Sequence, residues 1–274
     1  MAVRSAIIHV MAAAALKAAR GLIRDFGEVE QLQVSVKGPG DFVSNADLKA
    51  EQVLRTELQR ARPQFGLLME ESGESPGDGR HRWIVDPLDG TTNFLHGLPH
   101  FAISIACERD GEVIAGVIYE PLRDEMYWAE KGIGAYVNDR RLRVSARRRL
   151  PEAVIGTGIP FLGHGDHPAY LATLAPVMAA VSGIRRLGVA SLDLAFVAAG
   201  RLDGFWEFGL RPWDIAAGLL MVREAGGYVS DLVGGTSMMT TGDVLAANDH
   251  LHPQLLSLVA EGLRGESRFI GRGD

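Results

Sequence analysis

Two aspartates that follow a short apolar run are the residues of this chain best suited to chemistry. The run spans residues 83–85, and Asp86 and Asp89 come directly after it, with Pro87 fixing the backbone between them. Two carboxylates at this spacing repel each other unless cations lie between them. The segment therefore predicts a metal site at the end of a buried strand.

The residues after these aspartates are suited to hold a phosphate. Gly90 and Thr91 offer backbone N–H groups and a hydroxyl where the sequence predicts the start of a helix. The first N–H groups of a helix have no partner within the helix, so this end attracts anions. A metal cluster beside a phosphate seat indicates metal-assisted phosphoryl chemistry.

Further acidic segments support a metal site. Asp47 lies at a predicted helix start, Glu70 and Glu71 follow an apolar run, and Asp214 comes just before another helix. Each alone is explained by helix capping or by a solvated turn. Together they fall mostly at strand ends and helix starts, where α/β folds place ligand crevices. Oxygen ligands without clustered Cys or His favour Mg²⁺, Mn²⁺ or Ca²⁺ over zinc.

The composition indicates a folded protein with a sizeable core. The chain has 274 residues, of which 47% are apolar, and could form one large domain or two small ones. Its net charge of −6 argues against nucleic acid as the main ligand. Cys107 is the single cysteine, which excludes an internal disulfide and a cysteine-based zinc site. Its apolar surroundings predict a core position, and a reducing compartment is expected.

An apolar N-terminal stretch raises the question of targeting. Residues 6–16 could be taken for the core of a signal peptide, but His9 and Lys17 interrupt the apolar character. Apolar positions continue at helical spacing to Phe26, which favours an amphipathic helix. No segment reaches the ~18 uninterrupted apolar residues of a membrane span. We expect a soluble, cytoplasmic protein that does not contact a membrane.

Hydrophobic periodicity divides the chain into two halves with a seam near residue 150. Residues 1–150 are expected to form an N-terminal α+β half that carries most metal ligands, and residues 151–274 an α/β half that completes one compact catalytic unit. The expected N-terminal elements are helices at 2–26 and 44–61, a strand at 66–69, a loop at 74–81 and an antiparallel meander at 101–107, 113–119, 125–129 and 135–137. The expected C-terminal elements are strands at 153–157, 204–208, 228–230 and 244–247 and helices at 168–181, 191–199, 215–225 and after 250. The alternation predicts stacked helix and sheet layers.

An arginine-rich stretch from residue 140 to residue 149 has two interpretations. Six arginines in ten residues suggest a nucleic-acid surface. No aromatic residue is interleaved with them, and Asn138-Asp139 is typical of a turn. We therefore expect a solvated turn or the edge of a sheet.

Several segments resemble a known family. Residues 86–94 and 213–218 are similar to the two signature motifs of the inositol monophosphatase family. Residues 41–47 and 70–72 match its two other characteristic segments, in the same order. The resemblance spans nearly the whole chain, from Lys37 to beyond Gly227, and is strongest with the bacterial branch.

The resemblance implies a fold and an activity. The fold is the αβαβα five-layer sandwich of the inositol monophosphatase and fructose-1,6-bisphosphatase type, usually as a homodimer. The activity is Mg²⁺-dependent, lithium-sensitive hydrolysis of a small phosphorylated alcohol, with two or three Mg²⁺ per site. Inositol 1-phosphate is the leading substrate. Histidinol phosphate, fructose 1,6-bisphosphate and 3′-phosphoadenosine phosphate are nearby alternatives, and histidinol phosphate stays open.

The resemblance also implies roles for single positions. The metal ligands are Glu70, Asp86, the Leu88 carbonyl, Asp89 and Asp214. The catalytic residues are Asp47 and Thr91, which orient the attacking water, and Glu70, which supports it. The substrate-binding residues are Asp89, Gly90, Thr91, Arg185, Glu207 and Asp214. Among these, Gly90 and Thr91 hold the phosphate through their amides, and Arg185 and Glu207 contact the alcohol.

A few residues depart from the family pattern or leave a choice open. Val189 replaces a small polar residue and Ser191 an alanine, both on the substrate side, so they bear on substrate preference. His96 and His100 flank the main motif and are expected to be structural. Some bacterial relatives bind the transcription machinery, and such a partner is the alternative to a purely enzymatic role.

Overall fold

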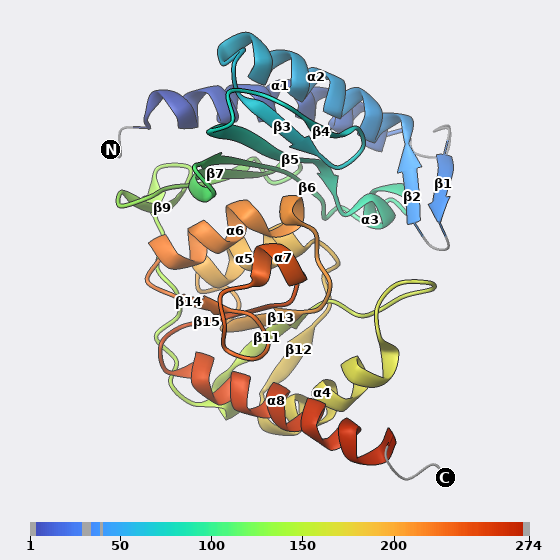
Figure 1. Ribbon diagram of the computed structural model, residues 1–274, viewed down its shortest axis with the longest axis vertical. Helices are drawn as coiled ribbons and strands as arrows, with labels where there is room; N and C mark the ends of the chain where they lie inside the picture. Colours follow the sequence, from blue (N-terminus) through green and yellow to red (C-terminus); the bar gives the residue numbers. More distant parts are fainter. Residues whose placement is uncertain (1–3, 29–33, 39–40, 271–274) are drawn as a thin grey trace.

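The computed structural model describes residues 4–28, 34–38 and 41–270, with side chains described for residues 4–28 and 45–264. The described chain forms alternating layers, with a helix pair, a sheet, a second helix pair, a second sheet and a third helix pair stacked along the long axis (Figure 1). This αβαβα layering confirms the expected fold class.

The first layer consists of α1 (Ala6–Phe26) and α2 (Asn45–Ala61). The Ser5 side chain accepts a hydrogen bond from the Ile8 N–H at 3.4 Å, so α1 begins after Ser5 and not at residue 2. Of the helices in the described residues, α1 is the one long and apolar enough to cross a membrane, with 44% of its most apolar stretch buried in this fold. Met11 and Leu22 are buried in the cluster that includes the first sheet, so α1 is a core helix here.

The first sheet places the main acidic motif. Its described strands are β3 (Gly66–Met69), β4 (Gly73–Ser75), β5 (His81–Asp89), β6 (Ala102–Arg109), β7 (Glu112–Glu120), β8 (Glu125–Glu130), β9 (Gly134–Val137) and β10 (Arg140–Arg141), in the order β10-β9-β8-β7-β6-β5-β3-β4. From β5 to β10 neighbouring strands are antiparallel, which confirms the expected meander. The pair β3–β5 is parallel, so both strands end at the same edge of the sheet.

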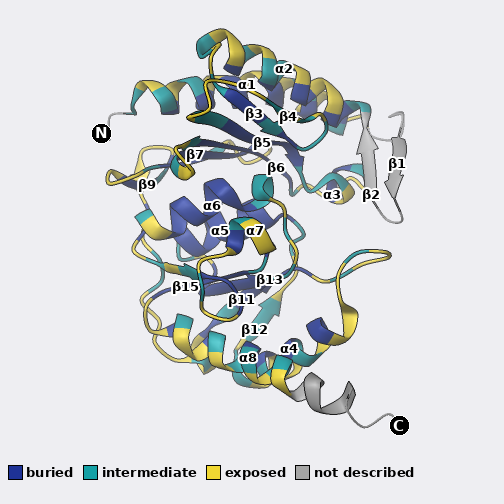
Figure 2. Ribbon diagram, viewed as in Figure 1, coloured by how far each residue is buried: buried dark blue, intermediate teal, exposed yellow. Residues whose placement is uncertain are grey.

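The helices between the sheets are α5 (Ala190–Ala198) and α6 (Pro212–Glu224). Figure 2 shows both as mostly buried, because a sheet covers each side of the pair. Small residues permit this close stacking: a Cβ at Gly116 of β7 would lie 2.9 Å from the Ala217 Cα, and one at Gly218 would lie 2.5 Å from the Leu194 Cβ. A larger side chain at Gly116 would push β7 away from α6, and one at Gly218 would push α6 away from α5.

The second sheet completes the sandwich. Its described strands are β11 (Val154–Thr157), β12 (Gly183–Arg185), β13 (Gly204–Glu207), β14 (Tyr228–Ser230) and β15 (Val244–Ala247), in the order β12-β11-β13-β15-β14. The outer helices α4 (His167–Ala180) and α8 (Leu251–Ile270) cover its far face (Figure 1). Trp206 of β13 points into this outer core, whereas Phe205 faces α5 and α6. This alternation places Glu207 on the same side as Phe205.

Short elements account for most differences from expectation. The hairpin β1 (Val34–Gly38) and β2 (Asp41–Ser44), the helix α3 (Thr91–Leu95), the turn η2 (Leu150–Glu152) and the helix α7 (Met238–Thr241) complete the described elements. The loop expected at 74–81 was partly wrong, because Gly73–Ser75 pairs with β3 as the edge strand β4. The strand β12 was not predicted, since three residues carry too little periodicity to signal it.

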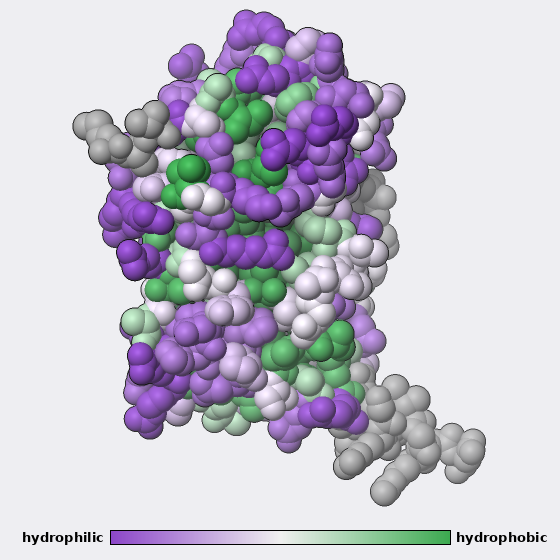
Figure 3. Space-filling model, turned by 60° about the vertical axis from the view of Figure 1, so that its left-hand side comes forward, coloured by the Kyte–Doolittle hydropathy of each residue, from purple (hydrophilic) through white to green (hydrophobic). Residues whose placement is uncertain are grey.

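The arginine-rich stretch begins at the edge of the first sheet, as expected, and continues to the second half, where Arg147 pairs with the buried Asp203. Arg140 and Arg141 form β10, the outermost strand, and both are exposed. Asn138 has a φ of 51°, typical of the turn that precedes this strand. Cys107 is fully buried in the first core, and burial raises the pKa of its thiol to about 12. On the face shown in Figure 3, hydrophilic side chains cover most of the surface and separate the apolar patches.

Candidate active site

The parallel pairing of β3 with β5 brings the first two acids together. Met69 is in register with Val85, so Glu70, which follows β3, lies beside Asp86 of β5. The Glu70 N–H donates to the Val85 carbonyl at 3.2 Å, which holds this alignment beyond the last paired residues. A hydrogen bond links the side chains of Glu70 and Asp86. Two acids far apart in the sequence thus meet at the end of one buried strand.

An irregularity in β5 aims both motif aspartates toward the site. Residues three positions apart in a regular strand point to opposite faces of the sheet. The pairing of β5 with β6 shifts register between Asp86 and Asp89, and Pro87 lies within the shift. Such an irregularity redirects side chains, so the two carboxylates can serve one site.

Two side chains of this motif join the halves of the molecule. Asp89 Oδ2 accepts a hydrogen bond of 2.8 Å from the Ser191 N–H in the first turn of α5. Asn93 Nδ2 donates to the Leu187 carbonyl at 2.9 Å and to the His100 carbonyl at 3.0 Å. The main acidic segment therefore also sets how α5 sits against the first sheet. The role of Asn93 was missed from sequence, because its partners are backbone atoms of distant segments.

Backbone N–H groups orient two further carboxylates. The Leu88 N–H donates to Asp86 Oδ1 at 2.9 Å. The Arg211 N–H donates to Asp214 Oδ2 at 2.7 Å, at the start of α6. One oxygen of each carboxylate is fixed in this way, and carboxylate oxygens have lone pairs for additional partners. The geometry holds the acids in place before any ligand arrives.

Thr91 lies between Asp47 and the backbone of the motif. Its Oγ1 is 3.0 Å from Asp47 Oδ1 and 3.0 Å from the Leu88 carbonyl oxygen. The single hydroxyl proton can be donated to either acceptor, which leaves the oxygen lone pairs for a further donor. Asp47 is fully buried on the first turn of α2. The fold thus brings together Asp47 and Thr91, which are far apart in the chain.

Gly90 is required by its close surroundings. Its φ is 96°, and a Cβ there would lie 2.8 Å from Val189 Cγ2 and 3.3 Å from the His100 carbonyl oxygen. Any side chain would be strained by the backbone and would collide with Val189. Val189, noted from the sequence as a departure, is fully buried and packs against this glycine. It therefore supports the turn that carries Thr91.

The crowding of acids raises their proton affinity. Burial, followed by the charge of Glu70, raises the pKa of Asp86 well above its usual range. Burial, followed by the charge of Asp89, does the same to Asp214. Burial also raises the pKa of Asp89, while the hydrogen bond from Ser191 opposes this rise. Bringing a cation to these acids would relieve their mutual repulsion.

A pocket of about 660 Å³ opens onto these acids. Its lining includes Glu70, Glu207 and Asp214 together with residues 158–161 and 164–166. Arg185 does not line it: this exposed residue donates from its guanidinium to the Ile184 carbonyl at 2.9 Å. The pocket therefore brings together acids from both sheets, and the predicted contact of Arg185 with the alcohol stays a prediction.

Two acids, one partly and one fully buried, lie on the side of the second sheet. Burial, followed by the charge of Asp89, raises the pKa of Glu207 to about 8, and Arg186 opposes the rise. Asp193 of α5 is 1% exposed, and its Oδ1 has no hydrogen-bond partner in the described residues. The sequence analysis missed Asp193. A lone acid inside the apolar run 190–198 was the available signal, since acids are almost never fully buried unless paired.

The donors fit a hard cation, although they do not enclose one. Within the described residues, no three Asp, Glu, His or Cys side chains converge tightly enough to form a complete metal cage. The acids near the pocket offer carboxylate oxygens only, the chemistry that Mg²⁺ and Ca²⁺ prefer. Burial is the main cause of the raised pKa values of Asp86 and Asp214, and the charges of neighbouring acids add to it.

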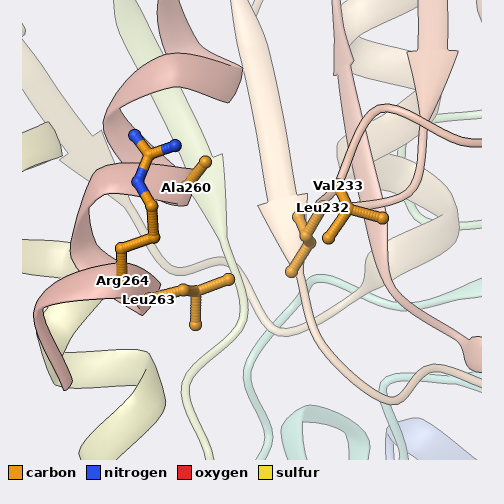
Figure 4. A pocket seen from close by; sticks show the side chains of 5 residues that line it. All are labelled: Leu232, Val233, Ala260, Leu263 and Arg264. Atoms are coloured by element: carbon orange, nitrogen blue, oxygen red, sulfur yellow. The ribbon is translucent and has the colours of Figure 1, made fainter. Parts of the chain in front are cut away.

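A second pocket differs in chemistry. It has a volume of about 370 Å³ and lies between α8 and the loop after β14 (Figure 4). Figure 4 shows Ala260, Leu263 and Arg264 on one side and Leu232 and Val233 on the other. None of these five lining residues is acidic, so they offer no carboxylate to a metal.

Known proteins are similar to this chain over almost its whole length. The model of the inositol monophosphatase family matches residues 4–264. An inositol-1-monophosphatase of Mesorhizobium japonicum is 61% identical over 261 residues, 95% of this chain and 98% of the relative. The Nus factor SuhB of Escherichia coli K12 is 42% identical over 261 residues, 95% of this chain and 96% of the relative. The solved structure of extragenic suppressor protein suhB from Bartonella henselae has a TM-score of 0.91 and 59% identity, covering 93% of this chain and 98% of that chain.

The layered fold and the match in sequence agree with each other. The acids that the resemblance singled out lie at the ends of β3 and β5 and at the starts of α2 and α6. Their order along the chain is that of the family motifs named from the sequence. The chain belongs to the inositol monophosphatase family.

Proposed function

We propose that this phosphatase hydrolyses inositol 1-phosphate to inositol and phosphate with the help of Mg²⁺. Membership of the family and the named relatives support phosphatase activity. The observation that carries the proposal is the group of carboxylates formed by Glu70, Asp86 and Asp214: Asp86 is buried, and Glu70 and Asp214 line a pocket of about 660 Å³. Water attacks phosphorus, the bond from phosphorus to the alcohol oxygen breaks, and the alcohol leaves with a proton.

The proposed metal ligands are two acids that line the pocket, Glu70 and Asp214, and the β5 residues beside them. They are Glu70, Asp86, the Leu88 carbonyl, Asp89 and Asp214, and they would hold two or three Mg²⁺. When bound, the cations would lower the pKa of water and neutralise charge on the phosphoryl group. The hydrogen bonds from Leu88, Ser191 and Arg211 support this set, because they pre-orient its carboxylates.

The residues around Thr91 would place the attacking water. When Thr91 donates its proton to Asp47, its oxygen can accept a hydrogen bond from that water. Glu70, at the same end of the pocket, would orient the water from the other side. The amides of Gly90 and Thr91 would hold the phosphate oxygens. Holding water and phosphorus in line is the main task of a protein in phosphoryl transfer.

The second sheet would recognise the alcohol. Glu207 lines the pocket and would accept hydrogen bonds from hydroxyl groups of the substrate. Arg185 would assist only after turning away from the Ile184 carbonyl, to which it donates at 2.9 Å. We therefore assign the larger share of alcohol recognition to Glu207.

A substrate panel tests the proposal. Phosphate release with Mg²⁺ is measured for inositol 1-phosphate, histidinol phosphate, fructose 1,6-bisphosphate and 3′-phosphoadenosine phosphate, with and without lithium. The proposal expects a lithium-sensitive preference for inositol 1-phosphate. A clear preference for histidinol phosphate would keep the reaction and replace the substrate. No release from any compound would refute the phosphatase assignment.

A second role rests on the similarity to the Nus factor SuhB of Escherichia coli, which is 42% identical. We propose as an alternative that a protein of the transcription machinery binds this chain. A pull-down with the wild-type protein and Asp89→Asn separates the two roles. If the inactive variant retains every partner and every cellular effect, the binding role is favoured. If the cellular effect is lost together with phosphatase turnover, the enzymatic role is favoured.

The assembly and location of the protein are part of the same proposal. We propose a cytoplasmic homodimer in which residues 1–150 and 151–274 of each chain form one catalytic unit. Light scattering coupled to size-exclusion chromatography tests the dimer. A mass of 29.5 kDa in solution would show a monomer.

A further inference from the structure

A tight hairpin forms one wall of the catalytic pocket. The N–H of Phe161 donates to the His164 carbonyl at 3.2 Å, and the His164 N–H donates to the Phe161 carbonyl at 2.9 Å. Gly163 sits in the turn with a φ of 79°, a conformation that suits glycine. The rings of Phe161 and His164 stack with centroids 4.6 Å apart at 27°. The hairpin thus presents two packed rings as a unit.

The hairpin lies near Glu207, which lines the same pocket. A Cβ at Gly158 would fall 1.8 Å from Glu207 Oε1, so the chain touches Glu207 there. Phe161 follows Gly158 by three residues, which places it within roughly 11 Å of that contact by the reach of the backbone. Phe161, His164 and Glu207 all line the same pocket. A substituent on the alcohol could therefore span from Glu207 to the rings.

The chemistry of this wall differs from that of the acidic end. Ile159 and Phe161 each leave 45% of their surface exposed, although both line the pocket. The neighbouring Asp166 accepts the Ala169 N–H at 2.9 Å, which commits one of its oxygens to the start of α4. Ile159 and Phe161 therefore give this wall apolar and aromatic surface that a ligand can contact. A polyhydroxylated alcohol alone leaves such surface in contact with water, whereas a ring would cover it.

We propose that the Phe161–His164 pair is a ring-binding subsite, through which this enzyme takes phosphate monoesters whose alcohol carries an aromatic ring. The inference rests on the proposed phosphatase function. The phosphate lies at the acidic end, the alcohol carbon passes Glu207, and the ring packs on the exposed part of Phe161. His164 holds the Phe161 ring in place from its other side. Phe161 is a specificity residue and takes no part in the bond-breaking step.

The test compares 2-phenylethyl phosphate with propyl phosphate and inositol 1-phosphate. The wild-type KM should be lower for 2-phenylethyl phosphate than for propyl phosphate. Phe161→Ala should raise the KM for 2-phenylethyl phosphate about three- to tenfold, the range expected for loss of an aromatic contact. Its kcat, and both constants for the other two substrates, should change by less than about twofold. Phe161→Tyr should retain the low KM, because the ring is kept.

Leu162→Ala is the matched control. Leu162 lies in the same turn, is 73% exposed and does not line the pocket, so all constants should stay near wild type. The inference is overturned if Phe161→Ala leaves the KM for 2-phenylethyl phosphate unchanged, raises all KM values alike, or acts no differently from Leu162→Ala. If the enzyme releases phosphate from propyl phosphate and inositol 1-phosphate but its KM for 2-phenylethyl phosphate is not lower than for propyl phosphate, only the subsite is refuted. Release from none of the three refutes the phosphatase function as well.

Discussion

The two sheets contribute to the active site in different ways. The first sheet supplies a compact motif: Asp86, Asp89 and Thr91 lie within six residues, and Glu70 joins them through the parallel pairing of β3 with β5. The second sheet supplies Glu207, and the loop after β11 supplies a pocket wall formed by residues 158–161 and 164–166. In the proposed mechanism, the first side provides groups that any phosphate ester requires, and the second provides surface that can vary with the alcohol. From this comparison we propose that reaction and recognition depend on different parts of the sandwich.

The layers are nevertheless joined at the reacting end. Asp89 accepts the Ser191 N–H of α5, and Asn93 donates to the Leu187 carbonyl just before α5. Asp214 enters from the start of α6, between the sheets. A substitution in the first sheet should therefore reduce kcat, while one in the second sheet should alter KM for particular alcohols.

The largest effect is expected at Asp89. Asp89→Asn removes a charge from the proposed metal set but keeps an oxygen to accept the Ser191 N–H. We expect kcat to fall by about 10³-fold or more, with the fold retained. Phosphate release and circular dichroism measure the two properties. Asp110→Asn is the control, because Asp110 is exposed with a φ of 52° that asparagine tolerates. Full activity of Asp89→Asn, or loss of its fold, would contradict the assigned role.

The next effect is expected at Thr91. Thr91→Ala removes the hydroxyl that lies 3.0 Å from Asp47. We expect kcat to fall by about 10²- to 10⁴-fold with little change in KM, because the hydroxyl acts on the water and not on the alcohol. Thr91→Ser should restore most of the loss. The exposed Thr92 provides the control Thr92→Ala. If Thr91→Ala changed mainly KM, a water-orienting role would be wrong.

A smaller and substrate-dependent effect is expected in the second sheet. At a pH above about 8, where Glu207 is mostly ionised, Glu207→Gln should raise the KM for inositol 1-phosphate about tenfold, because a charged hydrogen-bond acceptor for a hydroxyl is lost. The constants for propyl phosphate should change by less than about twofold, since it has no hydroxyl to bind. Arg185→Ala should have a smaller effect than Glu207→Gln, because Arg185 lies outside the pocket lining. Equal effects on both substrates would break the division between the sheets.

The smallest effect is a dependence of stability on pH. Burial raises the pKa of Glu207 from 4.5 to about 8, and raises those of Asp86 and Asp214 above 3.8. These acids bind protons more tightly in the folded chain than in the unfolded chain. Their contribution to the free energy of unfolding therefore falls as the pH rises from about 5 to about 8.

Magnesium should oppose this loss of stability at rising pH. The cation needs deprotonated carboxylates, so the gain in Tm on adding Mg²⁺ should grow over the same pH range. Thermal unfolding with and without Mg²⁺ at several pH values measures the gain. Asp89→Asn should show a smaller gain than Asp110→Asn. A gain that stays constant or shrinks with rising pH would argue against a metal site formed by these acids.

The chemistry could be predicted from the sequence better than the recognition. The acids of segment 86–94 lie in one stretch, and the apolar run before them predicted the buried strand. The meander also followed from local patterns, because the turns at Asp110-Gly111 and Lys131-Gly132 interrupt clear strand periods. Both depend on residues close in the sequence.

Features that depend on tertiary contacts escaped prediction. The hydrogen bond from Asn93 to the Leu187 carbonyl joins segments that are far apart in the sequence. The burial of Asp193 depends on the layers packed around α5. The stacking of Phe161 on His164 arises in a loop that has no hydrophobic periodicity. Arg185 is predicted to contact the alcohol; its guanidinium donates to the Ile184 carbonyl, and Arg185 is not among the residues that line the pocket. Position along a motif does not determine which way an exposed side chain turns.

The most direct test of the account is a Mg²⁺ titration of phosphate release from inositol 1-phosphate, run in parallel on the wild-type chain, Asp89→Asn and Asp110→Asn. The account predicts saturable, Mg²⁺-dependent release by the wild type and Asp110→Asn, and almost none by Asp89→Asn at any Mg²⁺ concentration. Release that does not depend on Mg²⁺, or that persists in Asp89→Asn, would contradict the claim that the acids of the first sheet carry out the reaction.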